Sequence, residues 1–450
     1  MTTMETRPVG TTKGFDRAWA EQALERARRA GEPAWSLDAR RTAAEIMTGL
    51  EFPSREIEIW RRSDFRLLEA SLPKLDAFAP ASEVRDPAGL PARVRSRVAD
   101  SPVESAVVVM GAGGVRWERI PASLAQRGVT VSSLDRAVRE HGDLVKRHLG
   151  AQLAPGYDWY TAAGATLRNG GAFVHVPDGV ELTEPVLLFH TLEGAGVTAM
   201  PRTVIVLGRG ARATVIEELI SDTADGIAFH NGASEVTVGE DAKLVHATLE
   251  EWGRNVYHYA NHRVKVERGG ELQWIQTLLG ARLAKVHSYF DLAGPGAQAF
   301  VHGFMFGDER QHFHLHTLQR HIADHTTSDL LIKGCLKDHA RSVYQGLIQV
   351  SEGAQRTDAY QANRNLLLSD TARADSIPGL EILANDVRCT HGATIGDVDP
   401  EQMYYLMARG LPRADAQRLI VEGFFAPVLD RIPLEHVRDE LRQVIERKIG

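Results

Sequence analysis

The sequence predicts a mainly β protein: a parallel β-helix with helical regions at both ends. From about residue 160 to 395, helical periodicity gives way to short β-branched and apolar runs separated by Gly and Asp turns. In this stretch a turn glycine precedes an expected strand at steps of 29, 30, 27 and 57 residues, at Gly210, Gly239, Gly269, Gly296 and Gly353. A degenerate period near 29 in a strand-rich region is typical of a solenoid, whose turns bury their faces on their neighbours. A large sandwich with coincidental glycines is the alternative.

These patterns divide the chain into three parts: a helical region with a linker (1–100), the β-helix core (101–398, regular from about 160) and a C-terminal helical region (399–450). Between Phe15 and Leu68 apolar residues recur at helical spacing, and Ser36 is the expected N-cap of a second helix. Residues 70–100 are rich in Pro, Ala and charge, which indicates a linker or irregular segment.

Helix-boundary residues mark three helices at the C-terminus. Asp399 followed by Pro400 is an N-cap with proline at the first helical position, and Gly410 stands where a C′ glycine belongs. Pro412 and Pro433 open two further helices by the same logic. Apolar residues recur here every three or four positions, which is more apolar surface than capping one end of a solenoid needs. We therefore expect part of this surface to bind a partner, through Phe424, Phe425, Val428 and Leu429.

Composition and charge exclude several classes of protein. With 450 residues, of which 43% are hydrophobic, the chain has material for a large core and is not disordered as a whole. Its net charge of −7 does not suit non-specific nucleic-acid binding. The two cysteines, Cys335 and Cys389, exclude a disulfide framework and a metal site of cysteines alone. The sequence lacks a phosphate loop, an apolar leader and an apolar run of about 20 residues, so we expect a cytoplasmic protein that itself binds neither nucleotide nor membrane.

A histidine-rich segment is the first candidate site. In a strand, His312, His314 and His316 project from one face, and neutral imidazoles bind zinc or iron. Alternate residues of a strand are about 7 Å apart, however, which is wide for one ion with ligands at about 2 Å. The face is therefore either a secondary metal site or, as we favour, a polar surface whose histidines hydrogen bond across neighbouring strands. We expect no stoichiometric zinc or iron there.

The second candidate is the pair Cys389 and His391. At positions i and i+2 of a strand they share one face, and a thiol beside an imidazole suits soft metals or sulfur chemistry. Two ligands do not complete a metal site, so the others must come from elsewhere in the chain or from a partner. A packed cysteine beside a hydrogen-bonded histidine is the alternative.

Longer segments around this pair resemble the SufB/SufD family, the core proteins of the SUF iron–sulfur cluster assembly complex. The most specific segments lie near the C-terminus: PGLEILANDVRCTHGATIG (378–396), EQMYYLMARG (401–410) and LIVEGFF (419–425). Upstream segments are also similar: EIWRRSD (58–64), HTTSD (325–329), KG (333–334) and ARSVYQG (340–346). The resemblance therefore extends from about residue 15 to the end of the chain.

Two departures point to the SufD branch of the family. Ala372 stands where SufB proteins carry a cysteine in a Gly-Asp-Lys-Cys segment, and Cys389-Thr-His391 stands in place of a Glu-His-Glu motif. The resemblance implies a right-handed parallel β-helix that pairs with SufB, and binding of the SufC ATPase at the C-terminal helices. It also implies that His391 helps to build the cluster at the SufB–SufD interface, with Cys389 as a neighbour whose role is not defined.

The resemblance thus predicts a scaffold subunit without catalytic turnover, in a complex where SufC hydrolyses ATP. A transient iron–sulfur cluster shared with SufB would form at His391, and this subunit would aid iron acquisition. Two rival interpretations stay open. One is a homodimeric, histidine-rich metal-binding or chaperone β-helix protein. The other is a β-helix polysaccharide lyase or hydrolase, although such enzymes need clustered acidic groups and are usually secreted.

Overall fold

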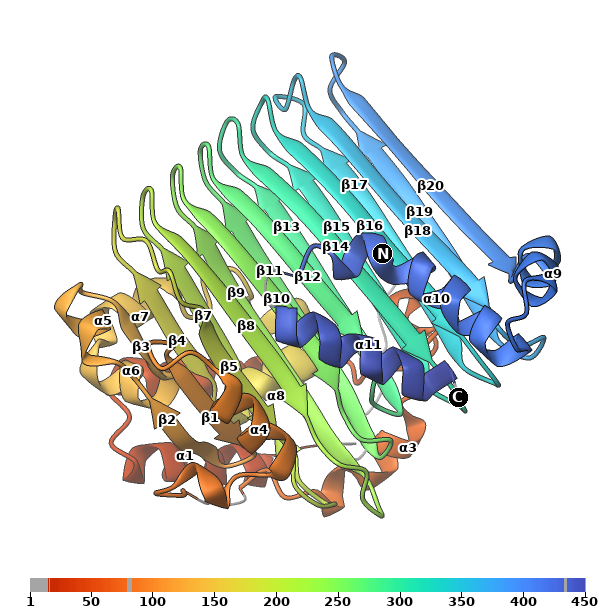
Figure 1. The fold of residues 1–450 in the computed structure, drawn as a ribbon. Coiled ribbons are helices and arrows are strands. Elements are labelled where there is room, and N and C mark those ends of the chain that lie inside the picture. Colours follow the sequence, from red (N-terminus) through yellow and green to blue (C-terminus); the bar gives the residue numbers. More distant parts are fainter. Residues whose placement is uncertain (1–14, 16, 79–82, 433–434, 450) are drawn as a thin grey trace, which may run out of the picture.

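The computed structural model describes residue 15 and residues 17–78, 83–432 and 435–449. Its centre is a parallel β-helix made of two long sheets, and helices lie against the outer face of each sheet (Figure 1). The predicted fold class is therefore confirmed: a β-helix core with helices near both ends of the chain.

Each turn of the β-helix contributes one strand to each sheet. Sheet 1 contains, in spatial order, β2 (Gly114–Arg119), β1 (Val107–Gly111), β5 (Val186–Thr191), β8 (Arg212–Ile220), β10 (Lys243–Glu251), β12 (Glu271–Leu278), β14 (Gln298–Gly307), β16 (Thr327–Leu336), β18 (Asp358–Leu367) and β20 (Arg388–Asp397). Sheet 2 contains β19 (Arg373–Ile382), β17 (Arg341–Val350), β15 (His312–His321), β13 (Leu283–Leu292), β11 (Val256–Val266), β9 (Ala228–Val238), β7 (Arg202–Leu207), β4 (Ala172–Val176) and β3 (Thr130–Ser133), with β6 (Thr198–Ala199) beside β9.

The strand register explains the repeat seen in the sequence. Arg212, Lys243, Glu271, Gln298 and Thr327 stand side by side on successive strands of sheet 1, 27 to 31 residues apart. Inward-facing apolar residues of both sheets then stack into one continuous core. Three of the predicted turn glycines have the positive φ that L-residues rarely adopt: Gly210 (65°), Gly269 (62°) and Gly296 (73°).

The N-terminal end of the β-helix is closed by elements that depart from the parallel pattern. β2 pairs antiparallel with β1, and β3 pairs antiparallel with β4. Four helices lie between β2 and β4 in the sequence: α5 (Ala122–Gln126), α6 (Leu134–Glu140), α7 (Gly142–His148) and α8 (Trp159–Leu167). Leu124 of α5 and Val131 of β3 belong to the inner core and cover its first turn. Leu134 and Val138 of α6 pack with Phe173 in a separate cluster on the outer face of sheet 2.

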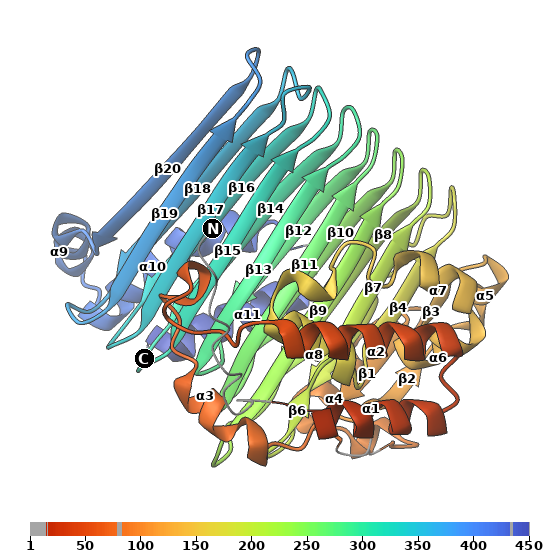
Figure 2. The ribbon, with the colours of Figure 1, turned by 180° about the vertical axis from the view of Figure 1, so that it is seen from behind.

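Helices from the start of the chain cover the outer face of sheet 2 (Figure 2). They are α1 (Arg17–Arg29), α2 (Ala34–Gly49) and α3 (Arg66–Ser71), together with α8. The contact is an aromatic layer in which Trp60 and Tyr160 meet Phe229 and Tyr259 of the sheet. Burial of such rings supplies much of the energy that holds the two layers together.

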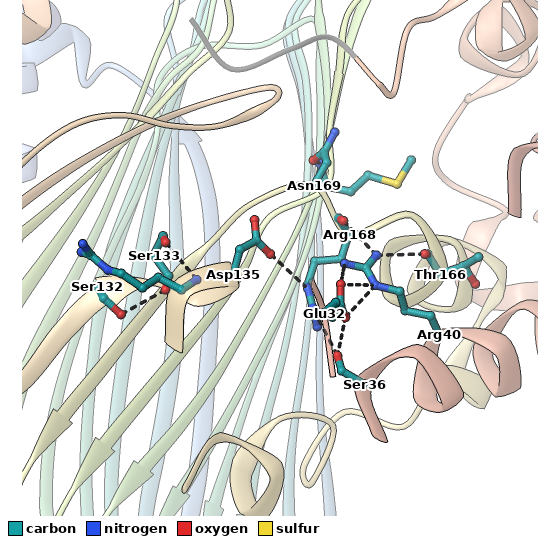
Figure 3. A network of polar contacts seen from close by, with 11 residues as sticks. Glu32, Ser36, Arg40, Ser132, Ser133, Asp135, Thr166, Arg168 and Asn169 are labelled. Carbon is teal, nitrogen blue, oxygen red and sulfur yellow. Dashed lines mark hydrogen bonds and ion pairs between the residues drawn. The ribbon is translucent and has the colours of Figure 1, made fainter. Parts of the chain in front are cut away.

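A buried ionic network ties the N-terminal helices to the β-helix (Figure 3). The carboxylate of Glu32 accepts hydrogen bonds from Arg40 and from Arg168, whose side chains are each 5% exposed. Ser36 also donates to Glu32 from within α2, which begins at Ala34. The predicted N-cap role of Ser36 is therefore wrong, because its hydroxyl is used by this carboxylate instead of the helix end.

The outer face of sheet 1 is covered by C-terminal helices α10 (Arg413–Leu429) and α11 (Glu435–Ile449). Part of the expected linker, residues 70–100, is helical instead: α4 (Ala92–Asp100) buries Val94 and Val98 in the same apolar cluster. The linker prediction missed helix α4 because only two of its apolar residues form the contact with this cluster.

Helix α9 (Pro400–Ala408) follows the last strand directly, and its boundaries match the prediction. Asp399 accepts a hydrogen bond from the backbone N–H of Glu401, and Gly410 has a φ of 94° after the helix end. Pro412 precedes α10, whereas Pro433 lies outside the described residues. None of the helices in the described part of the chain is long and apolar enough to cross a membrane.

Candidate functional site

Cys389 and His391 lie on β20, the last strand of sheet 1. Their register neighbours on β18 are Ala359 and Gln361, which are 1% and 0% exposed and face the interior. Cys389 packs against the small apolar cluster of Ala359 at the end of the core. By the alternation of side chains along a strand, His391 faces the same side. The predicted shared face is therefore present in the structure.

This end of the β-helix is open. In the described residues β19 and β20 each have a strand on one side and none on the other. Ile382 on β19 is 39% exposed, whereas its register neighbour Val350 one turn earlier is fully buried. His391 is also exposed, while Gln361 beside it is not. The site thus lies where the stacked core stops without a covering layer.

The two candidate ligands differ in chemical state. Partial burial, followed by the nearby charge of Asp358, raises the pKa of the Cys389 thiol above its ordinary value. Cys389 is therefore a neutral thiol near pH 7, and a thiol binds metal only after losing its proton. The imidazole of His391 is the better ligand of the two as the chain stands.

The predicted histidine face lies on β15, where His314 and His316 form hydrogen bonds and the buried Nε2 of His312 has no partner. His314 Nδ1 contacts Ser63 Oγ at 2.7 Å, and its Nε2 contacts Gln345 Oε1 at 2.8 Å. His316 Nδ1 lies 3.0 Å from the Tyr289 hydroxyl. Because the amide oxygen can only accept, His314 Nε2 carries the proton, and Nδ1 uses its lone pair on a neighbour. Neither nitrogen of His314 is free to bind a metal.

The same face is held in the neutral state by burial. Desolvation, with a contribution from Lys285, lowers the pKa of His316 to about 4. Desolvation, with contributions from Arg341 and Lys285, likewise lowers the pKa of His312 to about 4. Among the described residues, no group of three or more His, Cys, Asp or Glu side chains is arranged to hold a metal ion. The geometry therefore favours the hydrogen-bonded surface, and the expectation of no stoichiometric metal stays a prediction.

The four apolar residues expected to bind a partner are mostly used within the chain itself. Phe425 and Val428 are fully buried and Leu429 is 3% exposed, all against sheet 1. Phe425 meets Phe304 with ring centroids 4.9 Å apart, and Phe424 is partly buried beside it. The prediction of these side chains as a partner surface is corrected: they dock α10 on the β-helix. The exposed apolar residues of this region are Tyr404, Tyr405, Met407 and Leu419.

A polar cluster inside the β-helix escaped the sequence analysis. Glu217 lies between His190 and His246, with nearest N–O distances of 3.6 and 3.5 Å. Burial alone would raise the pKa of Glu217, but contacts with both histidines outweigh it and lower that pKa. His230 and His258 are register partners with their Nδ1 atoms 2.9 Å apart. A histidine that recurs after one turn of 28 residues is the signal that could have revealed this cluster.

Comparison with protein families identifies the family of the chain. The SufBD core domain of the SUF system for FeS cluster assembly matches residues 190–424, and the SufBD protein N-terminal region matches residues 29–188. The first match includes β20 with its Cys389 and His391. The chain belongs to the SufBD family. The family resemblance inferred from the sequence is thereby confirmed.

Individual relatives of this SufBD protein agree with the family match. The iron–sulfur cluster assembly protein SufD of Bacillus subtilis is 32% identical over 74% of this chain and 78% of its own length. An iron–sulfur cluster assembly SufBD family protein of Staphylococcus saprophyticus is 25% identical over 75% of this chain and 73% of its own length. A Staphylococcus aureus member of the same family is 24% identical over the same shares. A polysaccharide lyase or hydrolase is therefore no longer a competing interpretation.

Proposed function

We propose that this SufBD family member is a SufD-type scaffold subunit of a SUF iron–sulfur assembly complex. In this proposal it pairs with a SufB-type subunit through the open end of its β-helix, and it has no catalytic turnover of its own. The observation that carries the proposal is the position of His391: an exposed imidazole on an edge strand, at the end of the core that no described element covers.

The open end has the chemistry of an interface. Free N–H and C=O groups along an edge strand attract another strand, and exposed apolar residues add buried area on pairing. Three such residues lie on the last two strands, on the face that continues the core: Leu380 at 38%, Ile382 at 39% and Ile395 at 47% exposed. A second β-helix that adds strands to β19 and β20 would cover them. A homodimer formed through the same two edges is the competing arrangement.

The nascent cluster is cargo rather than a resident cofactor in this proposal. His391 supplies one neutral nitrogen ligand, and the chain offers no complete ligand set around it among the described residues. The remaining ligands, including cysteine sulfur, would come from the SufB-type partner. Cys389 becomes a ligand only if the cluster or the partner draws off its proton. Iron acquisition would use the same imidazole before sulfur arrives.

The C-terminal helices offer the surface for a SufC-type ATPase. Tyr404 is 76% and Tyr405 is 57% exposed on α9, and Leu419 is 49% exposed on α10. Exposed aromatic residues close together are typical of binding surfaces, whereas single exposed apolar residues are common. Because Phe425 is in the core, we assign ATPase binding to the exposed residues instead.

Replacing His391 with alanine tests the cluster site. A surface imidazole leaves no cavity when it is truncated, so His391→Ala should fold and pair with the partner normally. The complex purified from cells should then lack the cluster, measured as iron and sulfide content and visible absorbance. His141→Ala, at an exposed histidine near the closed end, is the matched control and should keep the cluster. Full cluster content in an intact His391→Ala complex would refute the site.

Paired substitutions test the ATPase surface. Tyr405→Asp combined with Leu419→Asp should abolish co-elution of the ATPase while the chain keeps its thermal stability, because both side chains are exposed. Phe425→Asp should instead lower the stability of the whole chain, because it buries a charge. Retained ATPase binding in the folded double variant would exclude this surface.

A further inference from the structure

A pocket of about 190 Å³ lies beside the buried ionic network at the closed end of the molecule. Its walls come from α1, α2, α6, the end of α8 and the turn between β1 and β2. The exposed residues Ala30 and Arg139 mark its mouth, whereas the buried residues Leu167 and Arg168 lie at its inner end. The pocket is therefore built from elements far apart in the sequence, at the opposite end of the sheets from β20.

Positive charge exceeds negative charge in the walls of this pocket. Four guanidinium groups and two carboxylates line it, those of Arg26, Arg40, Arg139 and Arg168 and of Glu32 and Asp135. The lining side chains therefore leave two positive charges without a negative counterpart in the pocket. A concave site with that balance attracts anions, and it matches the charge of a divalent one.

One of these cations, Arg168, is deeply buried and only partly paired. Figure 3 shows Arg168 between Glu32 on one side and Asp135 on the other. The side chains of Arg40 and Arg168 are each 5% exposed and share the carboxylate of Glu32. The Nε–H of Arg168 is buried without a hydrogen-bond acceptor among the described residues, and Asp135 Oδ1 lies 4.0 Å from it. Because a buried charge and an unbonded buried donor both cost free energy, an anion beside Nε would stabilise this residue.

The pKa of Arg168 indicates the same shortage of negative charge. Burial, followed by the neighbouring charge of Arg40, lowers this pKa to about 10, and Glu32 and Asp135 offset the shift only in part. A further negative charge within about 4–6 Å of a guanidinium favours its protonated form. An anion bound in the pocket would therefore raise the pKa of Arg168 toward its ordinary value.

The outer part of the pocket leaves room for more than the anion itself. Ala23 and Ala27 of α1 face it with small side chains, and Phe78 adds an apolar edge. Arg139 is exposed, and its Cδ lies 3.8 Å from the place where a Cβ on Gly31 would stand. The arginine side chain therefore extends over the turn between α1 and α2, at the mouth of the pocket. A volume of about 190 Å³ exceeds the space of a single phosphate group and admits a few further atoms.

We propose that this pocket binds a divalent oxyanion, either inorganic phosphate or the phosphate group of a small ester. Arg168 Nε donates to it at the inner end, and Arg139 contacts it at the mouth. Guanidinium groups match phosphate oxygens in both charge and geometry, which makes arginine the usual residue for such ligands. Because the walls combine α1, α2, α6 and α8, the bound anion also fastens the N-terminal helices to the β-helix. This site is separate from the proposed cluster chemistry and does not depend on it.

Thermal unfolding of the full-length chain at pH 8 tests the site. Inorganic phosphate, glycerol 3-phosphate and acetate are each compared with chloride at equal ionic strength. At saturation, the phosphate compounds should raise the unfolding temperature by about 2 °C or more, because they bind only the folded state, and acetate should not. A larger effect of the ester would identify a small phosphate ester as the ligand, and equal effects would identify the phosphate group alone. If neither phosphate compound differs from chloride, the proposal is overturned.

A matched pair of exposed arginines separates this pocket from a general charge effect. Arg139→Gln should keep the unfolding temperature measured in chloride and weaken phosphate binding by about 5-fold or more, measured by calorimetric titration. Arg147→Gln removes the same charge from α7, outside the pocket lining, and should leave the affinity unchanged. Equal affinities in the two variants would contradict the site.

Two further variants test the inner end and the available space. Arg168→Lys keeps the positive charge but removes Nε, so phosphate should no longer raise the unfolding temperature of this variant. Ala30→Leu narrows the exposed mouth without changing charge, so it should weaken binding of glycerol 3-phosphate more than binding of inorganic phosphate. If the lysine variant does not fold, the arginine pair still decides the question. A folded Arg168→Lys chain that keeps the full phosphate effect would place the anion elsewhere and refute the proposal.

Discussion

The two ends of the β-helix are built from the same repeat and finished differently. At the N-terminal end, the antiparallel strands β2 and β3 and helix α5 close the core. At the C-terminal end, β19 and β20 stop in register with β17 and β18, and no described element covers them. The described part of the chain therefore covers one end of the β-helix and leaves the other end exposed. An uncovered edge is a liability unless a partner uses it.

The chemistry of the two ends differs in the same sense. At the closed end charges are buried and paired, as in Glu32 with Arg40 and Arg168. At the open end the pair Asp358 and Arg388 is exposed to solvent. The exposed histidine and thiol also stand at the open end. The candidate site thus lies where the repeat stops, whereas the buried ion pairs lie in the covered part of the molecule.

Lowering the pH should have the largest effect on stability, because the covered turns contain many buried histidines that are neutral. Burial lowers the pKa of His258 and His262 to about 3, and that of His302 and His321 to about 4. These pKa values lie below the ordinary 6.5, so the folded state binds fewer protons than the unfolded state. The free energy of unfolding therefore keeps its full value above pH 6.5. It falls as the pH drops toward 4 and then 3, because the unfolded state takes up protons that these buried rings do not.

Each such histidine should steepen the pH dependence of unfolding by about 1.4 kcal/mol per pH unit below 6.5. Urea titrations at pH 7.5, 6.5, 5.5 and 4.5 measure this slope. His302→Gln should reduce the slope by about one proton. A free energy of unfolding that stays constant down to pH 5 would contradict the buried neutral state of these rings.

A matched pair of core positions tests whether the open end is truly uncovered. Val350 and Ile382 are register neighbours on β17 and β19, but Val350 is fully buried and Ile382 is 39% exposed. Val350→Asp should cost roughly 5 kcal/mol or more, because the carboxyl has no partner in the core. Ile382→Asp should cost about 1 kcal/mol in the isolated chain and still prevent pairing with the partner. Equal costs in urea unfolding would mean that the last turn is covered.

One buried and one exposed ion pair provide a second matched comparison, with a smaller expected loss of stability. Glu32→Ala leaves the buried guanidinium of Arg40 without its carboxylate and Arg168 with only Asp135 at 4.0 Å, so it should cost about 3–5 kcal/mol. Asp358→Ala breaks a pair that is 51% and 81% exposed, so it should cost at most about 1 kcal/mol. Thermal unfolding of both variants provides the comparison. A similar loss in both would show that exposure does not separate the two ends.

The repeat and its turns could be predicted because they depend on local chemistry. Turn glycines with positive φ, at Gly210, Gly269 and Gly296, are visible in the sequence at the spacing of the repeat. The shared face of Cys389 and His391 follows from strand alternation alone. That this strand is an edge does not follow, because a sequence cannot show that no further strand pairs with it.

Other features needed the three-dimensional register. The sequence shows that Phe425 is apolar but not whether it faces the protein's own sheet or a partner. Ser36 looks like a helix cap until Glu32 is seen to take its hydroxyl. Gln361 is unremarkable in sequence, and its position next to His391 comes from pairing across 30 residues of chain.

The smallest effect is expected from adding a single methyl group in the last turns. A Cβ on Gly346 would collide with the Tyr344 hydroxyl and with Gln361 Oε1, whereas a Cβ on Gly353 has no atom within 4 Å. Gly346→Ala should therefore cost about 1–3 kcal/mol, and Gly353→Ala should change stability by less than about 0.5 kcal/mol. Urea unfolding measures both. A Gly346→Ala chain with wild-type stability would show that the polar layer around Tyr344 and Gln361 has room to relax, and that the open end is less rigidly organised than its hydrogen bonds imply.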